Sequence, residues 1–185
     1  GLGVCLYLGR GTPEDPVLAA GLFKKAAAKG DPNAMSNLGS CYALGRGVAR
    51  DPARAITLFR EAATLGVPAA MVELGHAYRR GSGVAKAETD SREWYRKAAD
   101  AGSPFACYLI ASGAEAPEER FNWYRKAVEA KNSDDTVDFS ANEALVLDAL
   151  TDLANSYRDG KGTPKDGQKA VELYTKAAMG GSRRA

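Results

Sequence analysis

The chain has 185 residues, 45% of them hydrophobic and 26% charged, which is ordinary for one globular domain or one compact repeat array. The formal net charge of +2 gives little attraction for nucleic acid or an anionic membrane, and no apolar run approaches the roughly 20 residues of a membrane span. Three cysteines are too few for a disulfide-built scaffold, and a single histidine excludes a histidine-cluster metal site. We therefore expect no nucleic-acid binding, no direct membrane insertion and no cofactor.

The elements, taken in chain order, repeat with a period of 36 residues. The landmarks are a Leu-Gly pair, a Gly-x-Gly loop, an aromatic residue, an Ala-Ala pair and a closing glycine. Their first residues are Leu2, Leu38 and Leu74; Gly9, Gly45 and Gly81; Phe23, Phe59 and Tyr95; Ala26, Ala62 and Ala98; and Gly30, Gly66 and Gly102. A fixed period of this length indicates a repeat architecture.

Each unit predicts two helices joined by a turn. In the second unit, Asp31 is a candidate N-cap, Pro32 suits the first helical turn, and Gly45 stops the helix. One such hairpin cannot bury its own apolar face, so the units must stack. The predicted helices are 16–29, 32–44, 52–65, 68–80, 90–101, 104–113, 117–130, 143–158 and 167–179.

The period breaks in the second half of the chain. The motif that begins at Tyr95 returns at Tyr124, after 29 residues, and then at Tyr174, after 50 residues. The shortened unit lacks the Gly-x-Gly loop, and the last unit carries an insertion around 132–147. One array over 1–185 is therefore expected, with units at about 1–30, 31–66, 67–102, 103–131 (shortened) and 132–181 (with the insertion).

Residues 34–66 carry the pattern Ala-x-x-x-Leu-Gly-x-x-Tyr-x-x-Gly-x-Gly-Val, then Asp, then an aromatic residue followed by x-x-Ala-Ala-x-x-x-Gly. This pattern resembles the Sel1-like repeat, a relative of the tetratricopeptide repeat with a longer loop between its helices. The resemblance implies an all-α fold, a right-handed α/α solenoid superhelix of stacked helix-turn-helix repeats. It also implies a non-enzymatic adaptor or regulatory protein, of a kind often exported, periplasmic or lumenal in bacteria and eukaryotes.

The possible chemistry centres on His76, the only imidazole, which we expect to be exposed on a first helix. A catalytic base needs a positioned partner, and the sequence offers no nucleophile motif beside this residue. We expect no enzymatic activity. Two alternatives stay open: an enzyme acting on a cell-wall or other small substrate with His76 as base, and a structural spacer in a longer chain.

The cysteines are expected to be three buried free thiols. Cys5 and Cys41 lie one repeat apart, and neighbouring helices are about 8–10 Å apart, too far for a disulfide. In the insertion, Asp134, Asp135 and Asp138 lack the central glycine and terminal glutamate of a calcium loop. They favour a solvated loop or an acidic contact patch.

A partner protein or peptide is expected on the concave face that the first helices line, at positions opposite the core stripe. These positions vary between units while the core repeats. The predicted partner-binding residues are Asn37, Ser40, Val72, Glu73, His76, Arg79, Phe105, Tyr108, Ser112, Asp152, Asn155 and Arg158. Exposed aromatic residues are frequent hot spots, so we rank Tyr108 above His76 and expect the main site at the irregular units. A monomer or part of a longer chain is expected, and a narrower form of the function is an inhibitor or immunity-type protein.

Overall fold

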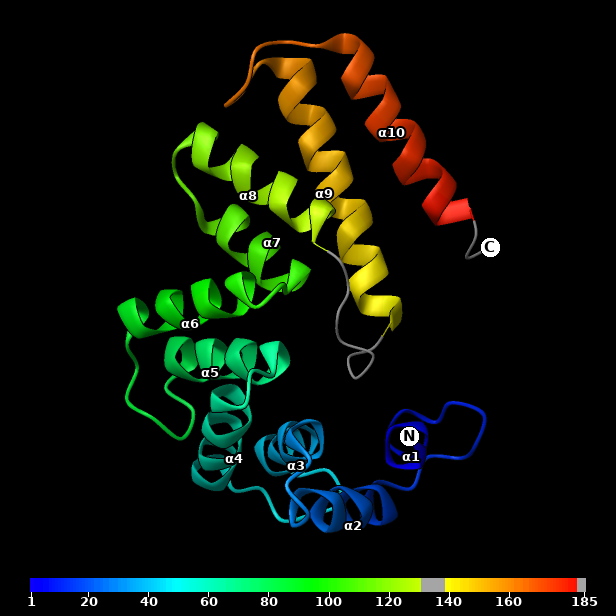
Figure 1. The fold of residues 1–185 in the computed structure, drawn as a ribbon, viewed down its shortest axis with the longest axis vertical. Helices are drawn as coiled ribbons and strands as arrows, with labels where there is room; N and C mark the ends of the chain where they lie inside the picture. Colours follow the sequence, from blue (N-terminus) through cyan, green and yellow to red (C-terminus); the bar gives the residue numbers. More distant parts are fainter. Residues whose placement is uncertain (131–138, 183–185) are drawn as a thin grey trace. The chain divides into compact units, whose positions relative to one another are not determined.

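The structure, a computed structural model, describes residues 1–130 and 139–182, and within these residues the chain is helical with no strand (Figure 1). This confirms the all-α fold class. Asp134, Asp135, Asp138 and much of the insertion lie outside the described residues. The helices are α1 (Leu2–Leu8), α2 (Pro16–Ala27), α3 (Pro32–Leu44), α4 (Pro52–Thr64), α5 (Pro68–Arg80), α6 (Glu88–Asp100), α7 (Pro104–Gly113), α8 (Pro117–Glu129), α9 (Phe139–Asp159) and α10 (Gly167–Ser182).

The predicted helices are confirmed, and the clearest difference lies at α9. This helix has 21 residues and begins at Phe139, four residues before the predicted start at 143. Part of the inserted sequence therefore lengthens a first helix rather than a loop.

The chain divides into two compact units, Gly1–Lys97 and Ala98–Ala185, and the boundary falls inside α6. In the N-terminal unit, α1, α2, α3, α4 and α5 pack each against the next. In the C-terminal unit, α7 packs on α8, α8 on α9 and α9 on α10, and the two first helices α7 and α9 also touch. Packing of sequential neighbours is typical of helical repeats.

In the four repeats that carry a Gly-x-Gly loop, the loop between the two helices is closed in the same way. Asp51 caps α4, accepting a hydrogen bond from the Arg54 backbone N–H, and its own N–H donates to the Tyr42 carbonyl at 2.9 Å. Loops of other repeats make the equivalent backbone bond. These are Asp15 to Leu6, Ala87 to Tyr78 and Asp166 to Tyr157. In these four repeats the second helix thus starts at a fixed place beside its first helix.

The Leu-Gly pair lets an aromatic ring of the second helix lie directly on the first. Phe59 is 2% exposed, and a Cβ on Gly39 would lie 2.7 Å from its ring. The same contact joins Gly3 to Phe23 and Gly75 to Tyr95. The glycine is required because a methyl group would occupy the space that the ring fills.

The second glycine of the Gly-x-Gly loop joins neighbouring repeats. Gly47 has a φ of +74°, and a Cβ there would strike the carbonyl of Pro16, at the start of the preceding second helix. Gly83 meets Pro52 and Gly162 meets Pro117 in the same way. This glycine therefore serves both the turn and the stacking.

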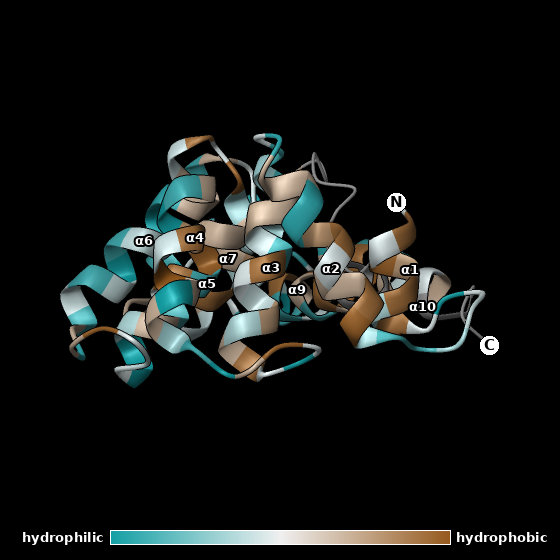
Figure 2. Cartoon of the chain, turned by 90° about the horizontal axis from the view of Figure 1, so that it is seen from below, coloured by the Kyte–Doolittle hydropathy of each residue, from teal (hydrophilic) through white to brown (hydrophobic). Residues whose placement is uncertain are grey.

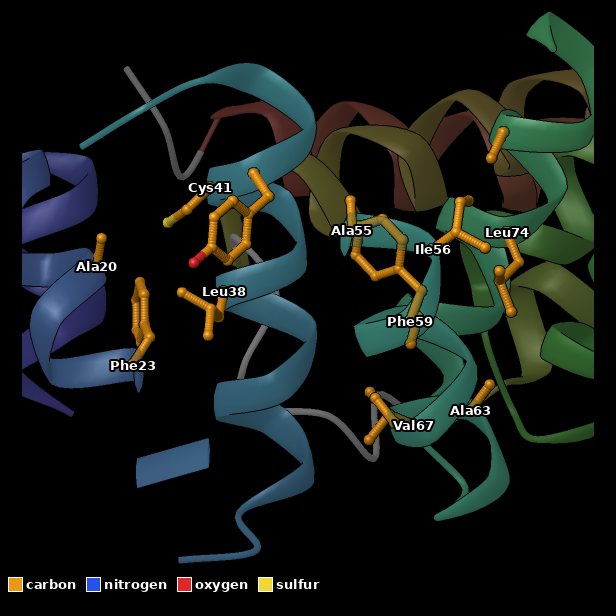
Figure 3. Packing of buried hydrophobic residues seen from close by; sticks show 14 of the residues in the cluster. Ala20, Phe23, Leu38, Cys41, Ala55, Ile56, Phe59, Ala63, Val67 and Leu74 are labelled. Atoms are coloured by element: carbon orange, nitrogen blue, oxygen red, sulfur yellow. The ribbon is translucent and has the colours of Figure 1, made fainter. Parts of the chain in front are cut away.

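The core of the N-terminal unit runs through the helix pairs as one cluster of buried apolar side chains (Figure 3). Phe23, Leu38, Phe59 and Leu74 are its larger members, and alanines fill the closest approaches between helices. Figure 2 shows α6 as largely hydrophilic and α1 and α2 as rich in hydrophobic residues, of which Val17 and Leu18 are exposed. Leu2, which is equivalent to the buried Leu38, is 64% exposed.

The three cysteines are free thiols, as predicted, although Cys5 is only half-buried. Cys41 and Cys107 are 0% exposed, and burial raises the pKa of each thiol to about 11. A thiol reagent attacks the thiolate, so both should be inert at ordinary pH.

Native protein at pH 8 should therefore react with a chromogenic thiol reagent mainly at Cys5, the most accessible of the three. Denaturant should raise the count to three, because unfolding exposes Cys41 and Cys107 and returns their pKa to the ordinary range. A native count of three at the same rate would show that these two sites are open to solvent.

Two glycine-to-alanine substitutions should have opposite effects on stability. Gly39→Ala places a methyl group against the Phe59 ring and should lower the free energy of unfolding by about 1–3 kcal/mol. Gly21→Ala, at an exposed position of α2 with no heavy atom within 4 Å of the new Cβ, should raise the free energy of unfolding by about 0.5–1 kcal/mol. Urea unfolding measures both, and equal effects would contradict the ring-on-glycine packing.

Candidate binding site

The predicted partner-binding residues fall into two groups, one in each compact unit. Those of the N-terminal unit lie on α3 and α5, and those of the C-terminal unit lie on α7 and α9. Two expectations of exposure are corrected. Val72 is 5% exposed, like the equivalent Ser36, and His76 is half-buried. A first helix inside the array contacts the preceding second helix as well as its own, so more than one side of it is covered.

A pocket of about 750 Å³ lies between α3, α4 and α5 in the N-terminal unit. Buried Ala55, Ile56 and Phe59 of α4 form its floor. Its walls and rim include, from α3, Ser40; from the loop before α4, Arg50; and from α5, Glu73, His76 and Arg80. Three of the residues predicted from the sequence to bind a partner, Ser40, Glu73 and His76, therefore line one pocket.

His76 is held by the second helix of its own repeat. The Tyr95 hydroxyl lies 2.7 Å from Nδ1, and the rings meet edge to face with centroids 5.5 Å apart. Burial, with the nearby charges of Arg79 and Arg80, lowers the pKa of His76 to about 4. The ring is therefore neutral at pH 7 and shares a hydrogen bond with the tyrosine hydroxyl through Nδ1.

This environment gives no support to the alternative in which His76 acts as a general base. A base works best with a pKa near the working pH, and this pKa lies well below it. Nδ1 is also occupied by Tyr95, with the Arg79 guanidinium 3.4 Å from the same nitrogen.

Glu73, one turn before His76, is half-buried in the pocket wall. Burial raises the pKa of its carboxyl, and the charge of Arg80 opposes that shift. Its negative charge also contributes to the raised pKa values of Tyr7 on α1 and Tyr95 on α6. The carboxylate therefore acts on groups of three helices.

In the C-terminal unit, two tyrosines meet the acidic side of α9. The rings of Tyr108 and Tyr124 have centroids 5.7 Å apart, and Asp152 accepts a hydrogen bond from the Tyr124 hydroxyl. Burial, followed by the charges of Asp152 and Asp148, raises the pKa of Tyr108. Tyr108 is half-buried, so the aromatic anchor expected from the sequence is partly used in packing.

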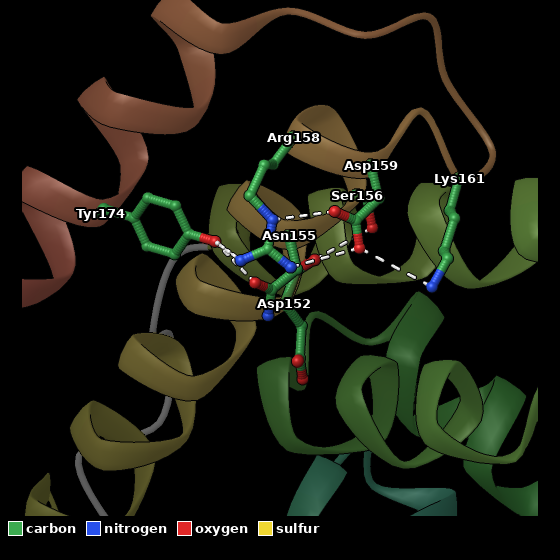
Figure 4. A network of polar contacts seen from close by, with 7 residues as sticks. All are labelled: Asp152, Asn155, Ser156, Arg158, Asp159, Lys161 and Tyr174. Carbon is green, nitrogen blue, oxygen red and sulfur yellow. Dashed lines mark hydrogen bonds and ion pairs between the residues drawn. The ribbon is translucent and has the colours of Figure 1, made fainter.

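The remaining predicted residues of α9 belong to a polar network with α10 (Figure 4). The Tyr174 hydroxyl donates to Asn155 Oδ1 at 2.6 Å, and the Arg158 guanidinium donates to the same hydroxyl at 3.2 Å. Arg158 also pairs with Asp159 at 2.8 Å.

On α7, Phe105 is half-buried, and the exposed Ser112 bonds within its own helix.

The contacts of Asn155 in the last repeat repeat those of His76. In each case the residue after the Leu-Gly or Leu-Ala pair is hydrogen-bonded to the hydroxyl of a tyrosine of the second helix. Where the aromatic residue is a phenylalanine, the corresponding residues are Val4 and Ser40. Helical periodicity alone does not predict these two pairings, although the change from phenylalanine to Tyr95 is a visible sequence signal for the first.

Within the described part of the chain, no three His, Cys, Asp or Glu side chains gather closely enough to hold a metal ion. The described helices include none that is both long and apolar enough to cross a bilayer.

Sequential helical hairpins with a repeated core and a varied first-helix face define an α/α helical-repeat protein. The Sel1 repeat model matches residues 1–31, 32–67, 68–103, 121–132 and 147–182, and the chain belongs to the Sel1 repeat family. In the shortened unit the Sel1 repeat model matches only residues 121–132, which include most of the second helix, α8.

Solved structures agree with this assignment. A protective antigen of uropathogenic Escherichia coli strains, described as displaying an SLR fold, is 32% identical over 96% of this chain, with a TM-score of 0.72. A Sel1 repeat protein of Oxalobacter formigenes is 28% identical over 97% of this chain and 71% of its own, with a TM-score of 0.77. The chain spans 37% of the length of the Escherichia coli protein.

An immunity protein of Pseudomonas aeruginosa matches more weakly, with 19% identity over 97% of this chain and 78% of its own, and a TM-score of 0.47. No curated protein matches the chain.

His76→Asn, which copies the residue at 155, should remove a pH dependence of stability. The pKa of His76 is about 4 in the folded chain against 6.5 normally, so the unfolded state takes up the proton first and stability falls below about pH 6.5. Between pH 7 and pH 5 the wild type should lose about 1–2 kcal/mol more than the variant, by urea unfolding at each pH. A parallel loss in both would show that His76 stays protonatable in the fold.

Proposed function

We propose that the chain is a non-catalytic binding scaffold that holds a partner protein or peptide at the pocket between α3, α4 and α5. The observation that carries this proposal is the composition of the pocket. Its buried side includes Ala55 and Phe59, at positions that stay small and aromatic in the regular repeats, whereas Ser40, Glu73 and His76 lie at first-helix positions that change from repeat to repeat. A repeat scaffold of this kind varies its binding face without altering its core.

The physical character of the pocket also supports binding. It combines buried apolar side chains with several polar and charged ones, so a ligand can make both kinds of contact there. Ser40, Glu73 and His76 come from two first helices, so one ligand can contact two repeats. The site residues of the C-terminal unit are more fully engaged with one another, as with Asn155 and Tyr174.

The expected contributions of His76 and Tyr108 to partner binding depend on where each residue lies. Composition alone ranks Tyr108 higher, as an aromatic residue beside the irregular units. The pocket, which His76 lines, supports the opposite order. We take the pocket as the principal site and the Tyr108 face as the second candidate, and the affinities of Tyr108→Ala and His76→Ala for one captured partner decide between them.

Filling the pocket should abolish partner binding. Ser40→Trp places an indole between α3 and α5 and should reduce the captured partner at least tenfold, because the ligand and the indole compete for one space. Ser112→Trp, at the equivalent exposed position in the shortened repeat, is the matched control and should leave capture unchanged. Affinity capture with each variant, followed by mass spectrometry and calorimetry on the partner found, makes the comparison.

A second variant guards against misfolding at position 40. Arg80→Glu changes an exposed rim residue and leaves the core intact, so its thermal unfolding should match that of the wild type. A partner captured equally by the wild type, Ser40→Trp and Arg80→Glu binds elsewhere, and that result would refute the proposal.

A further inference from the structure

The pocket contains a carboxylate whose hydrogen-bonding capacity is unused. Glu73 is half-buried, and among the described residues no side chain donates a hydrogen bond to it or lies within ion-pair distance of it. Arg80 acts on it only through its charge. A partly desolvated carboxylate is stabilised by a charged hydrogen-bond donor, and the described part of the fold supplies none to this one.

The last repeat shows how the same position is satisfied internally. Asp152 on α9 is equivalent to Glu73 on α5, because each lies two residues before the second residue of the Leu-Gly or Leu-Ala pair. Asp152 accepts a hydrogen bond from Tyr124, on the second helix of the preceding repeat. The residue at the corresponding place on α4 is Phe59, which has no hydroxyl. One carboxylate therefore has its donor, and the other faces a cavity floored by an apolar ring.

We propose that Glu73 is the anchor for a basic side chain, lysine or arginine, of the partner that binds in this pocket. This inference rests on the proposed function and adds the chemistry of the ligand. The methylene stem of such a side chain lies over Ile56, Phe59 and Ala77, and its charged end meets the carboxylate. A charge-assisted hydrogen bond there restores what Tyr124 supplies to Asp152.

The rim of the pocket indicates what flanks the basic side chain. Arg80 and Arg50 both line the opening, and Arg50 is positioned by a 3.1 Å hydrogen bond from Nε to the Ala43 carbonyl. Residues 34–86 carry seven Lys or Arg and three Asp or Glu. A lone cation would be repelled by these arginines, whereas a segment with a carboxylate beside its basic side chain pairs with both the wall and the rim.

A small probe with both charges tests this chemistry directly. Nα-acetyl-L-arginine carries a guanidinium and a free carboxylate, and Nα-acetyl-L-citrulline keeps the shape and the carboxylate but lacks the positive charge. Titration of the whole chain, followed by amide NMR shifts, should show saturable binding of the arginine probe around Glu73 and His76, with millimolar affinity. The citrulline probe should bind at least tenfold more weakly, a difference of about 1.4 kcal/mol.

Three variants assign the effect to the carboxylate. Glu73→Gln should weaken the arginine probe at least tenfold, and Glu61→Gln, an exposed glutamate on α4, should leave its affinity unchanged. Phe59→Tyr adds a hydroxyl at the position from which Tyr124 reaches Asp152, and it should weaken the probe severalfold by occupying Glu73. Thermal unfolding confirms that each variant is folded.

The inference is overturned if the two probes bind equally, if neither probe binds up to its solubility limit, or if Glu73→Gln and Phe59→Tyr both keep the wild-type affinity. These outcomes differ from failure of the proposed function. A partner that is lost with Ser40→Trp but indifferent to Glu73→Gln keeps the scaffold and removes the basic anchor. Probe binding at Glu73 with a partner unaffected by Ser40→Trp keeps the anchor chemistry and removes the pocket as the partner's site.

Discussion

The contact of an aromatic ring with a glycine fixes the geometry within each regular repeat. Because Gly39 has no side chain, Phe59 lies directly on the backbone of α3, and the two helices of the hairpin approach closely. Leu38, the residue before this glycine, belongs to the same buried cluster as Phe23 of the preceding repeat. Two adjacent residues of one motif therefore serve different purposes, one closing the hairpin and the other stacking it.

The Gly-x-Gly loop adds the second constraint, since its last glycine touches the start of the preceding second helix, as Gly47 touches Pro16. The shortened repeat lacks this pair in its sequence, and the division of the chain into two compact units falls inside α6, directly before that repeat. In repeat proteins each repeat contacts only its neighbours, and stability is approximately a sum of repeat and interface terms. A missing motif therefore changes the packing of its own repeat and of the adjacent ones. The regular repeats on either side keep the same loop bonds.

Much of the fold could be predicted from the sequence because residues that start or stop helices recur at regular positions. Asp-Pro pairs and glycines marked helix ends within a few residues, and only α9 began markedly early. The candidate site was harder to predict than the fold. Helical periodicity correctly groups Ser40, Glu73 and His76, but it takes no account of neighbouring helices. It therefore placed Val72 on an exposed face, although the structure buries it. Arg50 was missed because it lies in a loop, where helical periodicity makes no statement.

Whether a polar side chain of a first helix is hydrogen-bonded within the fold depends on whether the aromatic residue beside it carries a hydroxyl. Tyr95 engages His76, Tyr174 engages Asn155 and Tyr124 engages Asp152, so three first-helix polar groups are bound within the fold. Phe59 engages no polar group and leaves Glu73 facing the pocket. Phe59 and Tyr95 both pack on the glycine of their own hairpin, so exchange between phenylalanine and tyrosine at this position changes which first-helix polar groups are bonded within the fold while the hairpin keeps its geometry. In these repeats the aromatic residue thus belongs to the core by its ring, and its para substituent decides whether a first-helix polar group is bonded within the fold.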